Sequence, residues 1–202
     1  MKKLLAATAA SALLAGVAQA EDIKIGILYG FTGPIESLTK SMAAASEAAI
    51  DEVNASGLFL DGKTKVTAVR ADSTCIDAAA ATAAAEKLVT SDKVSGILGG
   101  DCSGVTGAVL ANVAVPNGIV MISPSATSPA LSTAEDHGLF FRTAPSDARE
   151  GEVAGEIMAE HGIKTAALTY SNSDYGKGLA EAIQKGFEAK GGKITISAAH
   201  ED

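Results

Sequence analysis

Short apolar runs alternate with longer segments of helical periodicity along the first two thirds of the chain. The runs, rich in β-branched residues, lie at residues 23–28, 65–70, 94–98, 119–122 and 139–142. Helices are predicted between them, at residues 37–56, 78–90 and 104–115. Gly57 is expected to end the first helix and Pro116 the third. Repeated strand–helix units of this kind predict an α/β fold with a doubly wound parallel sheet.

The helix predicted over residues 37–56 has apolar residues on one face. These are Met42, Ala45, Ala49, Ile50 and Val53. We expect this face to pack on the sheet.

A second alternation begins after Pro145. It predicts helices at residues 148–161 and 175–190 and strands at residues 165–170 and 193–197. A two-stranded sheet is marginal by itself. We therefore predict a first lobe at residues 21–143 and an incomplete second lobe at residues 144–202, so that the sequence is expected to be the N-terminal part of a longer protein.

The N-terminus has the pattern of a secretory signal peptide. Lys2 and Lys3 precede an apolar stretch at residues 4–17, and Ala18-Gln19-Ala20 forms a small-residue cleavage site. The stretch is shorter than the roughly 20 residues of a membrane span. Cleavage of residues 1–20 predicts a periplasmic protein, and the alternative is a buried N-terminal helix.

The amino-acid composition and net charge argue against some classes of function. The chain has 202 residues, of which 47% are hydrophobic and 20% charged, as in ordinary globular proteins. Its formal net charge is −8, no Lys/Arg cluster occurs, and aromatic residues make up only 4%. Nucleic-acid binding needs basic patches and often aromatic stacking, so we expect no nucleic-acid partner.

Cys75 and Cys102 are the two cysteines. In an exported chain an even number of cysteines suggests a disulfide, although two buried free thiols are the alternative. The three histidines, His137, His161 and His200, lie at no metal-ligand spacing from the cysteines. The sequence predicts no metal site and no cofactor.

Candidate ligand-binding segments follow three of the predicted strands, because open α/β sheets bind ligands beyond the carboxyl ends of their strands. The segments are residues 30–37, 99–104 and 123–129. Ser103 stands where a helix begins, so its hydroxyl, its N–H and the helix dipole suit a carboxylate or phosphate. Thr127 offers the same pair of donors. The alternative is that Ser103 is an N-cap and Thr127 a turn residue.

The signatures of enzymes do not fit. Ser103 stands one place too late for G-x-S-x-G, no phosphate-binding glycine loop occurs, and the S-x-x-K match at residues 37–40 lacks its partner motifs. Asp72 and Asp101 end strands and are read either as pocket acids or as caps of turns. Glu150 and Glu152 are read as ordinary acids at a helix start. We expect a protein that is not an enzyme.

Several segments, in order along the chain, carry a family resemblance. They are EDIKIGILYGFTGP, DSTC, GGDCSG, ISPSATSP and SDYGKGLA. Together they resemble the leucine/isoleucine/valine-binding proteins of ABC importers, over essentially all of residues 21–202. The resemblance implies a type I periplasmic-binding fold and a disulfide between Cys75 and Cys102. It also implies a free amino acid, most of all an aliphatic one, held between two hinged lobes and delivered to a membrane permease. We expect a monomer.

The same resemblance assigns roles to single residues. It implies that Ser103 donates to the ligand carboxylate, and that Thr127 binds the carboxylate through its N–H and the ammonium through its hydroxyl. The carbonyl of Ser125 would accept from the ammonium, and Tyr175 would close over the ligand. Leu38 stands where relatives often have an aromatic residue, which bears on side-chain selectivity. The acid that pairs with the ammonium is expected beyond residue 202.

Three alternatives remain open at this point. The same fold also serves as a sensor or binder of amides, urea or short-chain acids. A secreted α/β hydrolase would use Ser103 as nucleophile, and a stand-alone interaction module would bind no small molecule.

Overall fold

A computed structural model describes residues 22–201. The signal-peptide prediction for residues 1–20 lies outside the described residues. The elements up to residue 142 are β1 (Ile23–Tyr29), α1 (Glu36–Ser56), η1 (Phe59–Gly62), β2 (Val66–Asp72), α2 (Ala78–Lys87), η2 (Leu88–Asp92), β3 (Gly96–Gly99), α3 (Ser103–Val109), η3 (Leu110–Ala114), α4 (Val115–Asn117), β4 (Val120–Ser123), η4 (Pro129–Ser132) and β5 (Phe140–Arg142). The remaining elements are α5 (Asp147–Glu160), β6 (Thr165–Ser171), α6 (Asp174–Ala189) and β7 (Lys193–His200).

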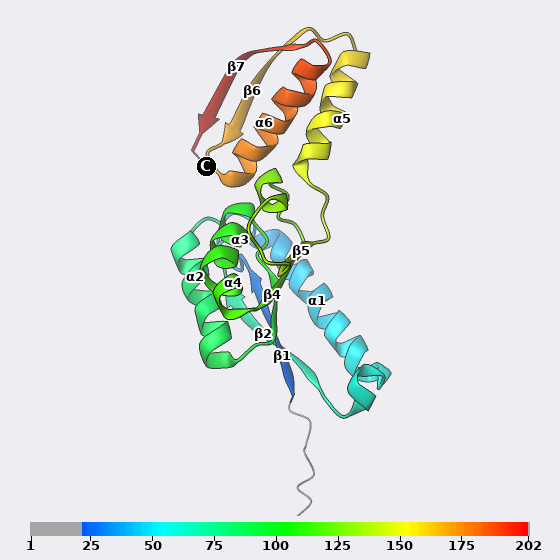
Figure 1. The fold of residues 1–202 in the computed structure, drawn as a ribbon, viewed down its shortest axis with the longest axis vertical. Helices are drawn as coiled ribbons and strands as arrows, with labels where there is room; N and C mark the ends of the chain where they lie inside the picture. The colour runs from blue at the N-terminus through cyan, green and yellow to red at the C-terminus, as the bar shows by residue number, and fades with distance from the viewer. Residues whose placement is uncertain (1–21, 202) are drawn as a thin grey trace, which may run out of the picture.

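The described strands form two separate sheets. The larger has the order β2-β1-β3-β4-β5, and every neighbouring pair is parallel. Figure 1 shows α1 on one side of this sheet and α2, α3 and α4 on the other. The doubly wound parallel sheet predicted from the sequence is confirmed.

The core of the larger sheet lies on both of its faces because successive strand residues point to opposite sides. On β1, Leu28 faces a large cluster that includes Leu88, Ile97 and Met121. Its neighbour Ile27 packs with Tyr29 and Ala43 beneath α1. The apolar pattern of β1 therefore reflects burial on both sides.

The predicted apolar face of α1 is partly wrong. The helix buries Thr39 and Ala43, whereas Ala45, Ala49 and Val53 are exposed. Alanines surround much of this helix, so the apolar periodicity did not define a single face. The Thr39 hydroxyl donates to the carbonyl of Gly30 at 3.0 Å and anchors the helix to the end of β1.

The helix predicted to stop at Pro116 continues to Asn117 and ends at Gly118, whose φ of 66° is left-handed. The π-helical turn η3 directly precedes α4, so the proline lies in the first turn of α4, where a missing N–H is tolerated. Glycine is the residue that adopts the left-handed end of the helix at least cost.

The second sheet pairs β6 and β7 in parallel, and Figure 1 shows it above the first unit, with the beginnings of α5 and α6 near the junction. The helices α5 and α6 pack very closely. A Cβ at Gly151 or Gly155 would collide with the backbone of α6. The boundary predicted at residue 143 stays a prediction, although the strands on its two sides fall into different sheets.

Candidate functional site

One cavity of about 580 Å³ lies at the carboxyl end of the larger sheet, between its loops and the beginnings of α5 and α6. It is lined by Pro34, Ile35, Leu38, Met42, Cys75, Ile76, Asp101, Cys102, Ser103, Ser125, Thr127, Asp147, Glu150, Ser171, Ser173 and Tyr175. The five residues that the sequence predicted as ligand contacts, Leu38, Ser103, Ser125, Thr127 and Tyr175, all belong to this lining. The structure brings them together, while their roles toward a ligand remain predictions.

The two cysteines form a disulfide at the wall of this cavity. The sulfurs of Cys75 and Cys102 are 2.06 Å apart and the Cα atoms 5.2 Å apart. The bridge joins the loop after β2 to the residue that precedes α3. The predicted pairing is confirmed, and the alternative of two free thiols is excluded.

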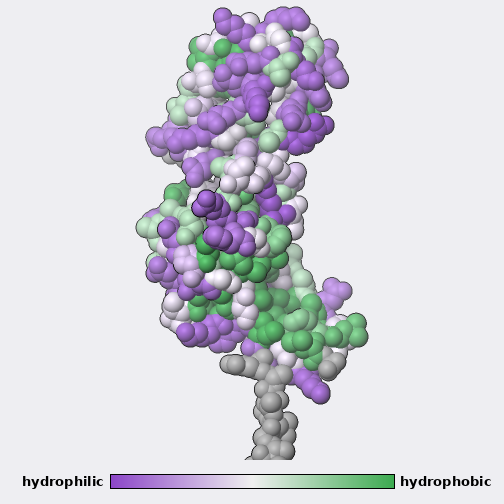
Figure 2. All heavy atoms as spheres, viewed as in Figure 1, coloured by the Kyte–Doolittle hydropathy of each residue, from purple (hydrophilic) through white to green (hydrophobic). Residues whose placement is uncertain are grey.

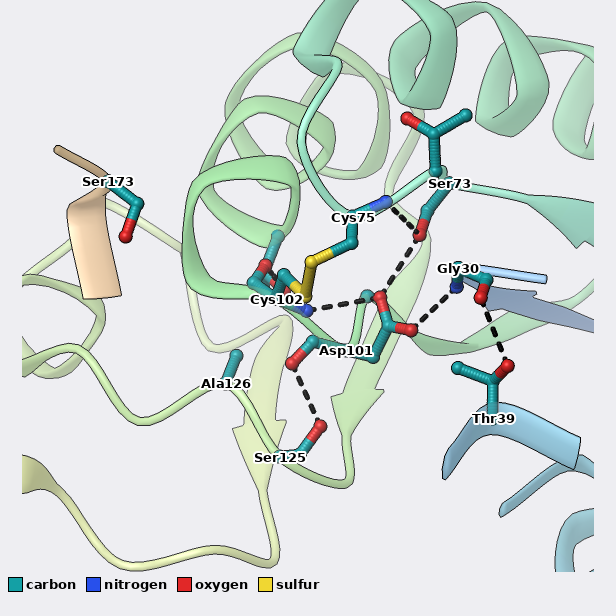
Figure 3. The surroundings of a disulfide bond; sticks show 12 residues. Gly30, Thr39, Ser73, Cys75, Asp101, Cys102, Ser125, Ala126 and Ser173 are labelled. Atoms are coloured by element: carbon teal, nitrogen blue, oxygen red, sulfur yellow. Dashed lines mark hydrogen bonds between the residues drawn. A yellow bond between two sulfur atoms is a disulfide. The ribbon is translucent and has the colours of Figure 1, made fainter. Parts of the chain in front are cut away.

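Asp101 fastens the loops around the disulfide (Figure 3). Its carboxylate accepts from the N–H of Gly30 at 2.6 Å, the hydroxyl of Ser73 at 3.0 Å and the N–H of Cys102 at 3.1 Å. Its main-chain carbonyl accepts from the hydroxyl of Ser125 at 2.8 Å. The buried carboxylate is thus paired within the protein, and one residue ties together loops that follow four neighbouring strands.

The other strand-end acid, Asp72, does not line the cavity. It accepts hydrogen bonds from the hydroxyl of Thr32 at 2.6 Å and from the N–H of Thr74 at 2.8 Å. Partial burial acts to raise the pKa of Asp72, but these hydrogen bonds outweigh it and lower the pKa below its usual range. Of the two readings left open for Asp72, the turn cap is the one the structure supports.

Ser103 is the first residue of α3, and Cys102 occupies the N-cap position. The N-cap alternative for Ser103 is therefore wrong. Its hydroxyl oxygen accepts from the N–H of Ser128 at 3.1 Å, which leaves the hydroxyl proton available to a ligand. The helix continues through η3 and α4 to Asn117, so the N-terminus facing the cavity belongs to a long helical segment.

Leu38 and Tyr175 line the open part of the cavity. Leu38 is 60% exposed and Tyr175 is 47% exposed. Burial, and then the negative charges of Asp147 and Glu150, raise the pKa of the Tyr175 phenol. The phenol therefore keeps its proton at neutral pH and can donate a hydrogen bond.

Asp147 was not predicted from the sequence as part of the site. This first residue of α5 is only 2% exposed, and its Oδ2 is buried with no hydrogen-bond partner. Its backbone N–H donates to the carbonyl of Thr127 at 3.0 Å, which places it beside the predicted ligand-binding loop. Burial raises the pKa of Asp147, and the nearby Thr127 hydroxyl and Arg142 charge offset only part of that effect. An acid at a helix start normally complements the helix dipole, so the sequence carried no signal that this one is buried.

The charge of the lining is entirely negative. Asp101, Asp147 and Glu150 face the cavity, and none of the described lining residues is Lys, Arg or His. Glu150, read from sequence as an ordinary helix-start acid, is thus part of the lining. No cluster of three or more His, Cys, Asp or Glu able to hold a metal occurs within residues 22–201. No helix in that range is both long and apolar enough to cross a membrane.

A second cavity of about 530 Å³ runs along α6 and shares no residue with the first. Glu152, Lys177, Glu181 and Lys185 lie along it, so its charges are mixed. None of the predicted ligand contacts belongs to its lining. Glu152 consequently lies outside the first cavity although it is only two residues from Glu150.

Comparison with known proteins gives concordant matches. A family model described as periplasmic binding protein matches residues 22–201. A Pseudomonas aeruginosa leucine-, isoleucine-, valine-, threonine- and alanine-binding protein is 32% identical over 97% of this chain and 51% of its own length. The chain therefore spans about half the length of this curated relative.

Solved structures share the fold. A Streptococcus pneumoniae branched-chain amino acid transporter substrate binding protein, in complex with isoleucine, is 30% identical with a TM-score of 0.74, over 89% of this chain and 50% of that one. A Rhodopseudomonas palustris solute binding protein in complex with benzoate is 24% identical with a TM-score of 0.79, over 89% and 48%. At that identity the second match supports the fold alone.

Proposed function

This chain belongs to the periplasmic binding protein family, and we propose that it forms the N-terminal part of the substrate-binding protein of an amino-acid ABC importer. Its ligand is a free aliphatic amino acid. The observation that carries the proposal is the single cavity lined by Ser103, Ser125, Thr127, Tyr175 and Leu38.

The first-lobe side of the cavity suits a carboxylate. The N-terminus of the helix that begins at Ser103 presents N–H groups and a positive dipole end. The Ser103 hydroxyl and the N–H of Thr127 add two further donors. Hydrogen bonds to a charged group are worth about 1.5–3 kcal/mol each, so a carboxylate can be held here without a cationic side chain.

Side-chain selectivity is assigned to the apolar part of the lining. Leu38, Met42 and Ile76 lie there together with Pro34 and Ile35. An aliphatic side chain would bury apolar surface against them at about 25 cal/mol per Å². The named aliphatic amino acids of the P. aeruginosa and S. pneumoniae proteins are consistent with such a surface.

Delivery to a membrane permease, residence in the periplasm after removal of residues 1–20, and a monomeric state complete the proposal. The family assignment and the relatives' transport roles support the first two. In such a protein closure of the lobes excludes water and gives the full affinity.

A ligand screen of the complete mature protein tests the proposed function. We expect one or more of the twenty L-amino acids to raise the melting temperature, with the largest effect from aliphatic ones, and calorimetry to give one site. A saturating ligand stabilises by mass action, so an effect of several degrees is expected. Stabilisation only by amides, urea or short-chain acids would support the rival binder instead. Covalent labelling of Ser103 by a fluorophosphonate would support the hydrolase, and no response to any small molecule would contradict both binding proposals.

A further inference from the structure

The two units of the molecule touch directly along the second cavity, and a glycine stands at the tightest point. In Figure 1 the beginning of α6 lies directly above the first unit. A Cβ at Gly178 of α6 would lie 3.0 Å from the Cδ of Pro129 and 3.0 Å from the Oγ of Ser128. Carbon atoms in favourable contact are about 3.5–4.0 Å apart, so these distances leave no room for a side chain. The missing side chain at residue 178 therefore sets how closely the second unit approaches the first.

A second close approach joins α6 to α3. A Cβ at Gly104 of α3 would lie 3.5 Å from the Oδ2 of Asp174, the first residue of α6. This is an ordinary van der Waals distance, so the contact is less tight than the one at Gly178. Gly104 follows Ser103 in the chain, and Thr127 lies just before the residues that face Gly178. The two units thus meet outside the lining of the first cavity but beside two of its predicted ligand contacts.

The first-unit side of the contact is held in place by hydrogen bonds. Ser128 is buried, and its N–H donates to the hydroxyl oxygen of Ser103 at 3.1 Å. Its carbonyl accepts from the guanidinium of Arg142 at 2.9 Å, which also donates to the carbonyl of Ala126 at 3.2 Å. Because both peptide groups of Ser128 are bonded, this loop cannot retreat from α6 without breaking buried hydrogen bonds.

The second-unit side of the contact is equally fixed, because α6 packs backbone against backbone on α5. A Cβ at Gly151 would collide with the main chain of Ala182, and a Cβ at Gly155 with that of Gly186. Gly178 lies one turn before Ala182 on the same helix. A longer side chain at residue 178 could turn into the second cavity, but the position of its Cβ is dictated by the backbone. The volume of that Cβ is therefore accommodated by separation of the two units.

The connection between the units permits such a separation. In the described part of the chain, residues 143–146 alone link β5 of the first unit to α5 of the second. Short links of this kind serve as hinges when domains close around a ligand. A contact that forms only when the units approach each other thus affects closure more than it affects the fold of either unit.

We propose that Gly178 is a positioning residue for ligand binding, which lets α6 come to rest on Ser128 and Pro129 when the two units close. This proposal rests on the proposed function, because only a protein that closes around its ligand gains affinity from the contact. The apparent affinity falls in proportion to the fraction of molecules able to adopt the binding-competent state. A side chain at residue 178 therefore weakens binding although it does not touch the ligand.

Two variants of increasing size, Gly178→Ala and Gly178→Leu, test this in the complete mature protein. Because overpacking a tight contact is costly, we expect calorimetry to show L-leucine binding weakened by about fivefold in Gly178→Ala and about 50-fold in Gly178→Leu. Alanine and leucine favour helix more than glycine does, so the melting temperature without ligand should stay equal or rise. Affinity and ligand-free stability thus respond differently. A loss of ligand-free stability that matches the loss of affinity would assign Gly178 a structural role and overturn the proposal.

Small-angle scattering reports closure itself. We expect the radius of gyration of the wild type to fall when L-leucine saturates the protein, and that of saturated Gly178→Leu to fall less. Equal contraction of the two proteins would overturn the proposal. Gly107→Ala is the matched control, because it makes the same substitution within α3 but its Cβ would meet only the Cδ2 of Leu131, at 3.9 Å. We expect this control to keep the affinity and the contraction of the wild type.

A double-mutant cycle tests the partner on the first unit. Pro129→Ala removes the Cδ that faces residue 178, so Gly178→Ala should weaken binding less in the Pro129→Ala background than in the wild type. Equal weakening in both backgrounds would exclude Pro129 from the contact and count against the proposal. Unchanged affinity in both Gly178 variants, with the wild type still binding, would overturn the inference and leave the proposed function intact. A wild type that binds no amino acid would instead remove the proposed function on which the inference rests.

Discussion

The two sides of the cavity differ in chemistry and in how they are held. The side formed by the larger sheet presents neutral donors, Ser103 and Thr127, on loops that are fastened from beneath by Asp101 and the Cys75–Cys102 disulfide. The side formed by α5 presents two acids, Glu150 and Asp147, and the buried Oδ2 of Asp147 has no hydrogen-bond partner among the described residues. The first side therefore offers neutral donors, whereas the charges of the second side are negative.

The two sides of the cavity also differ in the buried core that supports each of them. The larger sheet has a continuous buried core on one face and a second cluster on the other. In the part of the chain that forms β6 and β7, neither strand has a fully buried residue and β7 is mostly exposed, and the buried apolar side chains of α6 are Ala180 and Phe187. Figure 2 shows hydrophilic surface over much of this second unit, while hydrophobic surface gathers over the lower part of the first, where Leu58 and Leu60 are exposed. The donor side therefore rests on a more extensive buried core than the acidic side does.

Removal of the disulfide is the strongest way to disturb the donor side. Closure of a 27-residue separation by a disulfide stabilises a chain by about 3–4 kcal/mol in the loop-entropy model. We expect Cys75→Ser combined with Cys102→Ser to lower the free energy of unfolding by about 3 kcal/mol, measured by denaturant titration. Reductant should destabilise the wild type to the same extent and leave the double variant unaffected. A loss below about 1 kcal/mol would show that the loops are held by other contacts.

Substitution of Thr127 tests the hydrogen-bond donors of this side and leaves the disulfide and the Asp101 hydrogen bonds in place. We expect Thr127→Ala to weaken amino-acid binding by about 2 kcal/mol, or roughly 30-fold, because a hydrogen bond to a charged group is lost. Calorimetry on the complete protein measures this loss. Thr127→Ser keeps the hydroxyl and should retain most of the affinity, and Thr133→Ala is a control because Thr133 is exposed and outside the cavity. Unchanged affinity in Thr127→Ala would remove Thr127 from the site.

The pH dependence of affinity tests the acidic side. Because burial raises the pKa of Asp147, lowering the pH protonates this acid above the usual Asp range and removes a negative charge that would attract a ligand ammonium. We expect affinity to fall by up to about tenfold per pH unit below that raised pKa. The wild type should show this fall in calorimetry and Asp147→Asn should not. The same fall in both proteins would assign the titration to another group.

The raised pKa of Asp147 affects the stability of the ligand-free protein in the opposite direction: lower pH favours the folded state at this residue. A raised folded-state pKa means that Asp147 contributes most to stability below its usual pKa, and that the contribution is lost as pH rises through the raised pKa. We expect the difference in unfolding free energy between wild type and Asp147→Asn to shift in favour of Asp147→Asn as pH rises. Denaturant titration at several pH values measures this difference.

The smallest expected effect belongs to Glu150, which is exposed at the cavity. Solvent and salt screen exposed charges, so Glu150→Gln should change the affinity for L-leucine by only about two- to threefold. The change should shrink as salt is added. An effect as large as that of Thr127→Ala would mean that Glu150 contacts the ligand directly.

The sequence predicted the strands and helices and the residues of the candidate site to different extents. Strand and helix periodicity located each element of the two sheets within a few residues, because burial on one or both faces imposes the pattern directly. The face of α1 was misjudged because alanines surround the helix, and the helix at Pro116 was ended too early because a π-helical turn accommodates the proline. Residues that follow the strands, such as Ser103 and Thr127, could be named because strand ends meet at one edge of a parallel sheet.

The sequence by itself determined the alternation of strands and helices, the cysteine pair and the small hydroxyl residues that follow the strands. These properties depend on local spacing or on residue type. Only the tertiary structure decided how the surroundings of four similar acids differ, because burial and pairing depend on contacts between segments distant in sequence. Asp101 is buried and hydrogen-bonded to its neighbouring loops, and Asp72 caps a turn. Glu150 is an exposed charge at the cavity, and Asp147 is a buried acid whose Oδ2 has no hydrogen-bond partner among the described residues.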